Sequence, residues 1–152
     1  MREREYPPLL ASGFSDIAEA DLHEVFVKPF TYGAEDHRNN LVIDFIRFLK
    51  EFKTIRLPAE VWIDGSFATH APDPFDVDVV FYFDPRDVDA LEGETKAKFE
   101  RLFQSRKFIL GLYKVEVHYA VKGNEADYAQ WQRTFGTFYD NETPKGIFRL
   151  NY

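Results

Sequence analysis

The chain has 152 residues, of which 45% are hydrophobic and 17% aromatic, and its formal net charge is −7 at pH 7. This length and composition predict one folded domain over residues 1–152 with a sizeable core, and they exclude an intrinsically disordered chain. The negative charge argues against general nucleic-acid binding, because contacts with many phosphates need clustered Lys and Arg side chains.

The first third of the chain is expected to be mainly helical after an irregular lead. Residues 1–13 form this lead, because they contain proline and glycine residues that interrupt regular structure. Ser15 fits the N-cap of a helix through residue 27, with acidic side chains near its start, where the helix dipole favours them. Apolar residues at helical spacing predict a second helix over 36–53.

The rest of the chain alternates between strand and helix patterns. The expected strands are residues 60–64, 77–83 and 113–121. The expected helices are residues 91–106 and 125–135, with a loop over 67–74 and a turn-rich tail over 136–152. This order of elements predicts a domain of mixed α/β class.

Two aspartates at the start of the second predicted strand are the most informative residues. Residues 76–80 read DVDVV, so Asp76 and Asp78 point to one face of an extended chain and Val77 and Val79 to the other. Two carboxylates side by side repel each other, and a cation between them removes that cost. Oxygen ligands that leave room for a phosphate suit Mg²⁺.

A glycine–serine turn lies just upstream of these aspartates. Residues 62–66 read WIDGS, so a predicted strand runs directly into Gly65 and Ser66. Such a turn can present backbone N–H groups and a hydroxyl to a phosphate. The alternative interpretation of both motifs is an exposed strand whose aspartates are simply solvated after a proline-rich loop.

Together the two motifs resemble the signature of the DNA polymerase β-like nucleotidyltransferase superfamily. That signature is a hydrophobic strand, Gly-Ser or Gly-Gly, a short spacer, and Asp-hydrophobic-Asp-hydrophobic, and the match here covers residues 61–83. The chain also resembles a small bacterial branch of the minimal nucleotidyltransferases, through its WIDGSF stretch and its PKGI tail. The resemblance implies a nucleotidyltransferase fold of α+β type, with a small mixed sheet flanked by helices.

The resemblance implies a metal site of three carboxylates. In the superfamily a third acidic residue on the next core strand joins the first two, and the matching position here is Glu116, where Asp is the usual residue. Asp76, Asp78 and Glu116 are therefore the expected catalytic residues and the expected ligands of Mg²⁺ or Mn²⁺. The implied reaction moves a nucleoside monophosphate from an NTP, with ATP the expected substrate, to an acceptor.

Four further residues are expected to contact the nucleotide. The resemblance assigns phosphate contacts to Gly65 and Ser66, and a cation after a proline-set turn makes Lys145 a candidate clamp for the same phosphates. His118 shares the predicted strand face of the third carboxylate, so it is a candidate contact for nucleotide or acceptor. Phe67 departs from the pattern, because many minimal nucleotidyltransferases carry Arg directly after Gly-Ser.

The acceptor and the partners stay open at this stage. No large substrate-binding domain is evident, so a small molecule or a protein is the expected acceptor. Minimal members of the superfamily often act as antitoxins that modify a toxin, so a toxin-like partner or a defence role fits, and a homo-oligomer could complete a small site. The alternative is a catalytically inactive member that binds a nucleotide or a protein. A plain structural module is the third interpretation.

The sequence also carries expectations about location. It has no cysteine, which excludes disulfides and fits a reducing compartment. No apolar run follows the charged start, so no signal peptide is expected, and no stretch has the apolar length of a membrane helix. The expected location is the cytoplasm, with no membrane partner.

Overall fold

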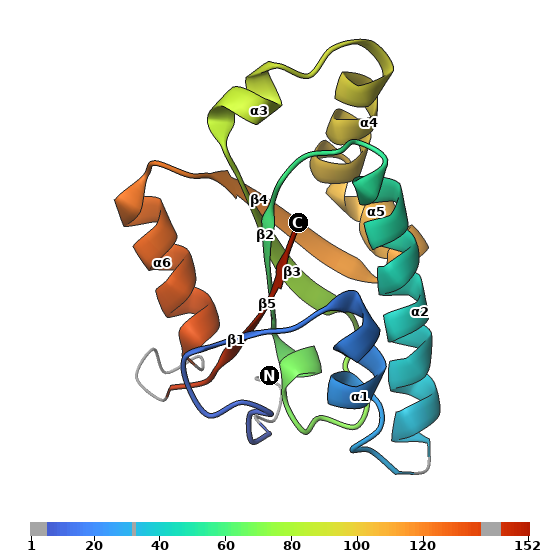
Figure 1. Ribbon diagram of the computed structural model, residues 1–152. Coiled ribbons are helices and arrows are strands. Elements are labelled where there is room, and N and C mark those ends of the chain that lie inside the picture. The colour runs from blue at the N-terminus through green and yellow to red at the C-terminus, as the bar shows by residue number, and fades with distance from the viewer. Residues whose placement is uncertain (1–5, 32, 138–143) are drawn as a thin grey trace.

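The computed structural model describes residues 6–31, 33–137 and 144–152 (Figure 1). Its fold is of mixed α/β class: a five-stranded mixed sheet, in the order β1-β5-β2-β3-β4, with helices on both faces. In Figure 1, α6 covers one face of the sheet, and α1, α2, α4 and α5 lie on the other. The expected fold class, a small mixed sheet flanked by helices, is confirmed.

The strands pair partly in parallel and partly in antiparallel fashion. β1 runs parallel to β5, β5 and β3 each run antiparallel to β2, and β4 runs parallel to β3. The strands are β1 (Phe14–Asp16), β2 (Glu60–Asp64), β3 (Val77–Phe83), β4 (Val115–Val121) and β5 (Ile147–Asn151). The bounds of β2 and β3 are those predicted, and β4 begins two residues later than predicted.

The helices connect these strands. They are α1 (Leu22–Phe26), α2 (Ala34–Lys53), α3 (Pro85–Asp89), α4 (Gly93–Gln104), α5 (Arg106–Tyr113) and α6 (Glu125–Gly136), with short 3₁₀ turns at Glu19–Asp21 and Ser66–Ala68. Among the described residues, no helix combines the length and the apolar character needed to cross a membrane.

The predicted helix over residues 15–27 is wrong in its first half. Phe14–Asp16 forms β1, and the helix α1 begins only at Leu22. The backbone hydrogen bonds of β1 go to β5, and the Asp16 carboxylate accepts from Arg149 at 2.6 Å. Pairing with a distant strand therefore overrides the local capping signal at Ser15.

The turn-rich tail predicted over 136–152 is also corrected. Its last part is β5, which lies between β1 and β2 and buries Ile147, Phe148 and Leu150. The turn residues over 138–143 lie outside the described residues. A short apolar run next to proline and glycine looks like a turn locally, and only its place in the sheet makes it a strand.

The predicted helix over 91–106 corresponds to α4, and the helix α5 that follows it was not predicted. α4 ends before Ser105, whose φ of −99° and ψ of 57° are not helical, and α5 follows directly. α5 ends at Tyr113, and the next residue, Lys114, adopts the left-handed conformation with φ 56°. Because the helix and this left-handed residue occupy positions 113 and 114, β4 starts at Val115 instead of residue 113.

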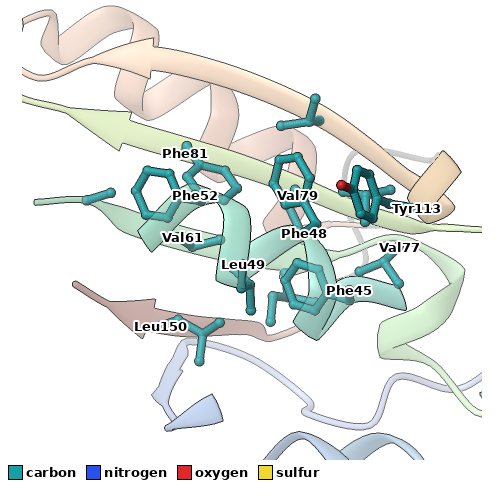
Figure 2. Packing of buried hydrophobic residues seen from close by; sticks show 14 of the residues in the cluster. Phe45, Phe48, Leu49, Phe52, Val61, Val77, Val79, Phe81, Tyr113 and Leu150 are labelled. Atoms are coloured by element: carbon teal, nitrogen blue, oxygen red, sulfur yellow. The ribbon is translucent and has the colours of Figure 1, made fainter. Parts of the chain in front are cut away.

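The main core lies between the sheet and α2, α4 and α5. Figure 2 shows Phe48 and Phe52 of α2 packed beside Val79 and Phe81 of β3. The other residues of β3 point to the opposite face of the sheet, which α6 covers. On that face, Val80 and Tyr82 form a smaller apolar cluster with Trp62 of β2. Because side chains alternate along a strand, Asp78 lies on the α6 face of the sheet.

Candidate functional site

Three carboxylates meet on the α6 face of the sheet. Asp78 of β3 lies directly opposite Glu116 of β4 in the parallel register, and Asp76 immediately precedes β3. Each of the three offers an oxygen atom, and these atoms all lie within 4.8 Å of one another. The predicted sharing of one face by Asp76, Asp78 and Glu116 is confirmed, and each of them is half-buried.

Asp76, Asp78 and Glu116 form an acidic triad, in which the two neighbouring carboxylates oppose the ionisation of Asp78. Burial raises the pKa of Asp78 above its usual range, and so do a hydrogen bond with Glu116 and the negative charge of Asp76. A positive charge close to Asp78 would favour its ionised form. Three carboxylate oxygens on half-buried groups form a donor set that suits Mg²⁺ or Mn²⁺.

The glycine–serine turn lies directly against the triad. Gly65 follows β2 with φ +74°, and a Cβ atom at this position would overlap the Asp78 carboxylate. Glycine is therefore required both by the backbone conformation and by the close approach of Asp78. Ser66 begins the 3₁₀ turn at Ser66–Ala68, and its carbonyl accepts a hydrogen bond from the Thr69 hydroxyl at 2.7 Å.

A buried arginine fixes the loop that follows this turn. Arg38 of α2 has no exposed surface, and its guanidinium stacks 3.7 Å from the centre of the Phe30 ring. It donates five hydrogen bonds, to the backbone carbonyls of Phe26, Phe67, Thr69 and Ala71. Sequence analysis missed Arg38, although a charged residue on the apolar face of a helical pattern was a visible signal.

A buried ion pair adjoins the triad. Asp64, the last residue of β2, is 1% exposed and lies directly opposite Asp78 in the antiparallel register. Lys145 places its Nζ 3.2 Å from Asp64 Oδ2. Burial raises the pKa of Asp64, and Lys145 and the Gly65 N–H act in the opposite direction. Sequence analysis placed Lys145 near the nucleotide but did not assign a role to Asp64, although it stands inside the WIDGS motif.

His118 lies on the other side of the triad. Its Nε2 is 3.7 Å from Glu116 Oε1 and 3.3 Å from Arg106 Nη2, and its ring lies 5.1 Å from that of Trp131 on α6. Burial lowers the pKa of His118, and the Arg106 charge adds to that effect. Arg106 also approaches Glu116 at 3.5 Å, a contact that sequence analysis did not foresee.

Phe67 belongs to the core. It has no exposed surface and stacks on Phe26, with ring centroids 4.5 Å apart. The residue that follows Gly-Ser therefore contributes to packing.

A family model described as a family of unknown function (DUF6932) matches residues 3–151, so the chain belongs to this family. Neither the comparison with curated proteins nor the comparison with solved structures gave a match. The family description assigns no activity, and a function has to be argued from the site itself.

Proposed function

We propose that the protein is a divalent-metal-dependent nucleotidyltransferase that moves a nucleoside monophosphate from an NTP to a small-molecule or protein acceptor. The observation that carries this proposal is the triad of Asp76, Asp78 and Glu116, whose oxygens lie within 4.8 Å of one another. Along the chain, Gly-Ser follows one strand and Asp-x-Asp lies at the next. This order of motifs underlies the resemblance to the nucleotidyltransferases, and that resemblance is the reason for proposing nucleotidyl transfer.

The residues present fit a divalent cation. The donor set is all oxygen, burial and the neighbouring carboxylates raise the pKa of Asp78, and the absence of a side chain at Gly65 lets the turn approach the Asp78 carboxylate. Mg²⁺ or Mn²⁺ bound there would neutralise charge on the phosphates and lower the pKa of an acceptor hydroxyl.

The chain's own groups would bind and orient the substrate. The Ser66 hydroxyl and the backbone N–H groups of the Gly65–Ser66 turn would donate to the phosphates, at a turn that Arg38 holds in place. The acceptor oxygen forms a bond to the α-phosphorus, the bond from that phosphorus to the bridging oxygen breaks, and pyrophosphate leaves. The proton of the acceptor hydroxyl passes to solvent.

Binding without transfer is the second candidate. Phe67, buried in the core, stands where many minimal nucleotidyltransferases carry Arg, and Arg106 lies beside Glu116. These observations favour a member of the superfamily that holds a metal and a nucleotide without turning them over. An experiment that measures binding and transfer separately distinguishes the two candidates.

The chain offers a matched control for such an experiment. Residues 76–78 and residues 87–89 both read DVD, but the second copy lies in α3, where side chains two residues apart point in different directions. We would incubate the protein with α-labelled NTPs, Mg²⁺ or Mn²⁺, and acceptors from a clarified cell extract. Variants Asp76→Asn/Asp78→Asn and Asp87→Asn/Asp89→Asn would be compared with the parent chain.

We expect metal-dependent binding and label transfer with the parent chain and the α3 variant, and neither with the triad variant. Metal-dependent binding without transfer, lost in the triad variant, would favour the second candidate. If the parent chain bound no nucleotide in the presence of either ion, both candidates would be wrong.

A further inference from the structure

A pocket lies at the end of β2 that is farthest from the acidic triad. It has a volume of about 270 Å³ and lies where the chain passes from α2 to β2, beside the residue that follows β5. Asp64, which lies opposite Asp78 of the triad, stands at the other end of the same strand. The pocket is therefore separate from the candidate site described above. Its lining combines apolar and cationic side chains: Phe52, Lys53, Arg56, Leu57, Pro58 and Tyr152.

The apolar part of this lining adjoins the main core. Phe52 and Leu57 are buried, and the rings of Phe52 and Tyr152 meet edge to face with centroids 5.6 Å apart. Figure 2 shows Phe52 beside Phe81 within that core. Apolar walls with a few polar groups are the usual form of a small-molecule site. The volume lies just below the roughly 300–1,000 Å³ of drug-sized sites, so the pocket suits a small ligand.

Arg56 has an unfavourable backbone conformation. Its φ is 60°, and Lys114 is the only other non-glycine residue with a positive φ in the described part of the chain. The left-handed conformation costs free energy in any residue with a Cβ atom, and glycine is the usual residue where a helix ends in this way. The backbone thus disfavours arginine at this position, which points to a role for its side chain.

The Arg56 guanidinium makes no hydrogen bond or ion pair with any of the described residues. Lys50 and Lys53, in the last turn of α2, complement the negative end of the helix dipole, and Lys53 also pairs with Glu19 at 3.0 Å. Arg56 lies beyond the helix, so neither explanation applies to it. An unpaired guanidinium on the lining of an apolar pocket is available to an anion.

A hydroxyl donor belongs to the same lining. The Tyr152 hydroxyl is buried and makes no hydrogen bond within the described part of the chain. Glu19 lies close enough to raise the pKa of this phenol, an effect to which burial contributes most, but both Glu19 oxygens are engaged by Lys53 Nζ, at 3.3 and 3.0 Å. A buried donor without an acceptor is costly. An acceptor bound in the pocket could supply what this hydroxyl lacks.

We propose that this pocket binds a small monocarboxylate with an apolar body, whose carboxylate pairs with Arg56. A guanidinium offers two parallel donors to the two oxygens of a carboxylate, and the apolar body would pack against Phe52 and Leu57. One negative charge is the charge that fits, because Lys53 is already paired with Glu19 and Arg56 is the free cation. The site lies apart from the triad and does not depend on the proposed nucleotidyl transfer.

Titrations of the ¹⁵N-labelled chain followed by NMR test this site with defined probes. Phenylacetate and octanoate are the monocarboxylates, phenylacetamide is a neutral analogue of phenylacetate, and phenethylamine is a cationic one. We expect the two monocarboxylates to shift the signals of residues 52–58 and 152. Phenylacetate should bind at least about tenfold more tightly than its neutral or cationic analogue, which is the effect of a charge-assisted hydrogen bond.

Two substitutions to glycine separate the side chain of Arg56 from its backbone. Arg56→Gly relieves the left-handed strain, so it should raise the thermal midpoint by about 1–4 °C while weakening phenylacetate binding to the level of phenylacetamide. Lys114→Gly is the matched control, because it relieves the same strain at the end of α5 and should leave phenylacetate binding unchanged. Arg56→Lys keeps the charge and should bind phenylacetate within about fivefold of the parent chain.

Three results would overturn the assignment. The first is that neither monocarboxylate binds the parent chain, and the second is that phenylacetate and phenylacetamide bind it equally well. The third is that folded Arg56→Gly still prefers phenylacetate to phenylacetamide. None of these results bears on the proposed function, which is measured by label transfer and by its loss in Asp76→Asn/Asp78→Asn.

Discussion

Two regions of this protein bury charge, and they satisfy it to different degrees. Arg38 uses all five of its N–H donors on backbone carbonyls and stacks on Phe30, although it has no exposed surface. By contrast, Asp64 leaves one buried oxygen without a partner in the described part of the chain, and burial and the neighbouring carboxylates raise the pKa of Asp78.

The difference supports the proposal that the acidic triad binds a ligand and that the Arg38 network serves the fold. A complete polar network holds a segment in one conformation and has nothing left to offer an incoming group. A crowded, incompletely paired cluster is unfavourable by itself and becomes favourable when a partner of opposite charge arrives. Arg38 therefore fixes the loop after Gly65, and the acidic triad is the place where binding is expected.

The largest effect should come from breaking the complete network. We expect Arg38→Lys to lower the free energy of unfolding by about 3–5 kcal/mol, because an ammonium group cannot reach all the carbonyls that the guanidinium serves. Arg47→Lys, at an exposed pair with Asp44, should change it by less than about 0.5 kcal/mol. Urea denaturation measures both, and equal losses would contradict the structural role of Arg38.

A second test concerns the contact between the turn and the triad. Gly65→Ala should lower the free energy of unfolding by about 3 kcal/mol, through backbone strain and overlap with Asp78. Gly13 has a similar positive φ and open space around it, so Gly13→Ala should cost about 1 kcal/mol. Thermal denaturation of both variants compares them, and if they lost the same stability, the contact of Gly65 with Asp78 would be unimportant.

A third test uses a substitution in the triad that should raise the free energy of unfolding instead of lowering it. In the presence of EDTA, Asp78→Asn should raise the free energy of unfolding by about 1 kcal/mol, because it removes a repelling charge from the triad. Mn²⁺ at 100 times its Kd should stabilise the parent chain by about 2.7 kcal/mol and leave the variant unchanged. Thermal midpoints with and without Mn²⁺ measure both effects. A variant less stable than the parent in EDTA would contradict the expected repulsion.

The smallest effect is expected at an exposed pair that serves as a benchmark. Arg149 donates to Asp16 and holds the pKa of that carboxyl at about 2, below its ordinary 3.8. Because the folded-state pKa is the lower one, the pair's contribution is present above pH 4 and disappears as the pH falls toward 2. The difference in thermal midpoint between the parent chain and Asp16→Asn should therefore become smaller as the pH falls from 4 to 2. A difference that stayed constant over this pH range would show that the ionisation of Asp16 does not contribute to stability.

Local patterns were enough to predict the centre of the sheet. β2 and β3 have the predicted bounds because their apolar runs and flanking breakers are contained in the segments themselves. The meeting of Asp78 with Glu116 was expected from the resemblance, which implied a third acidic residue on the next core strand. Alternation along the strand predicted the pair of Asp76 and Asp78, and the resemblance added Glu116.

The remaining parts depend on contacts between distant segments. The pairing of β1 with β5 joins Asp16 to Arg149, 133 residues apart, and no local signal in either segment names its partner. Arg38 and Asp64 are buried charges whose partners come from other parts of the chain. Sequence patterns show that such a residue stands on an apolar element, but only the fold shows what neutralises it.

The position of β5 has a consequence for the order of folding. This strand is the only neighbour of β1 within the described sheet, and it also borders β2, so the sheet closes only when segments 14–16 and 147–151 come together. Bringing together two segments so far apart in the sequence costs conformational entropy, so the pairing of β1 with β5 is expected to be slow and late. Lys145 lies two residues before β5, so the acidic residues of β2 and β3 can assemble before their lysine arrives. Until the last strand docks, Asp64 would therefore lack the lysine that neutralises it in the folded protein.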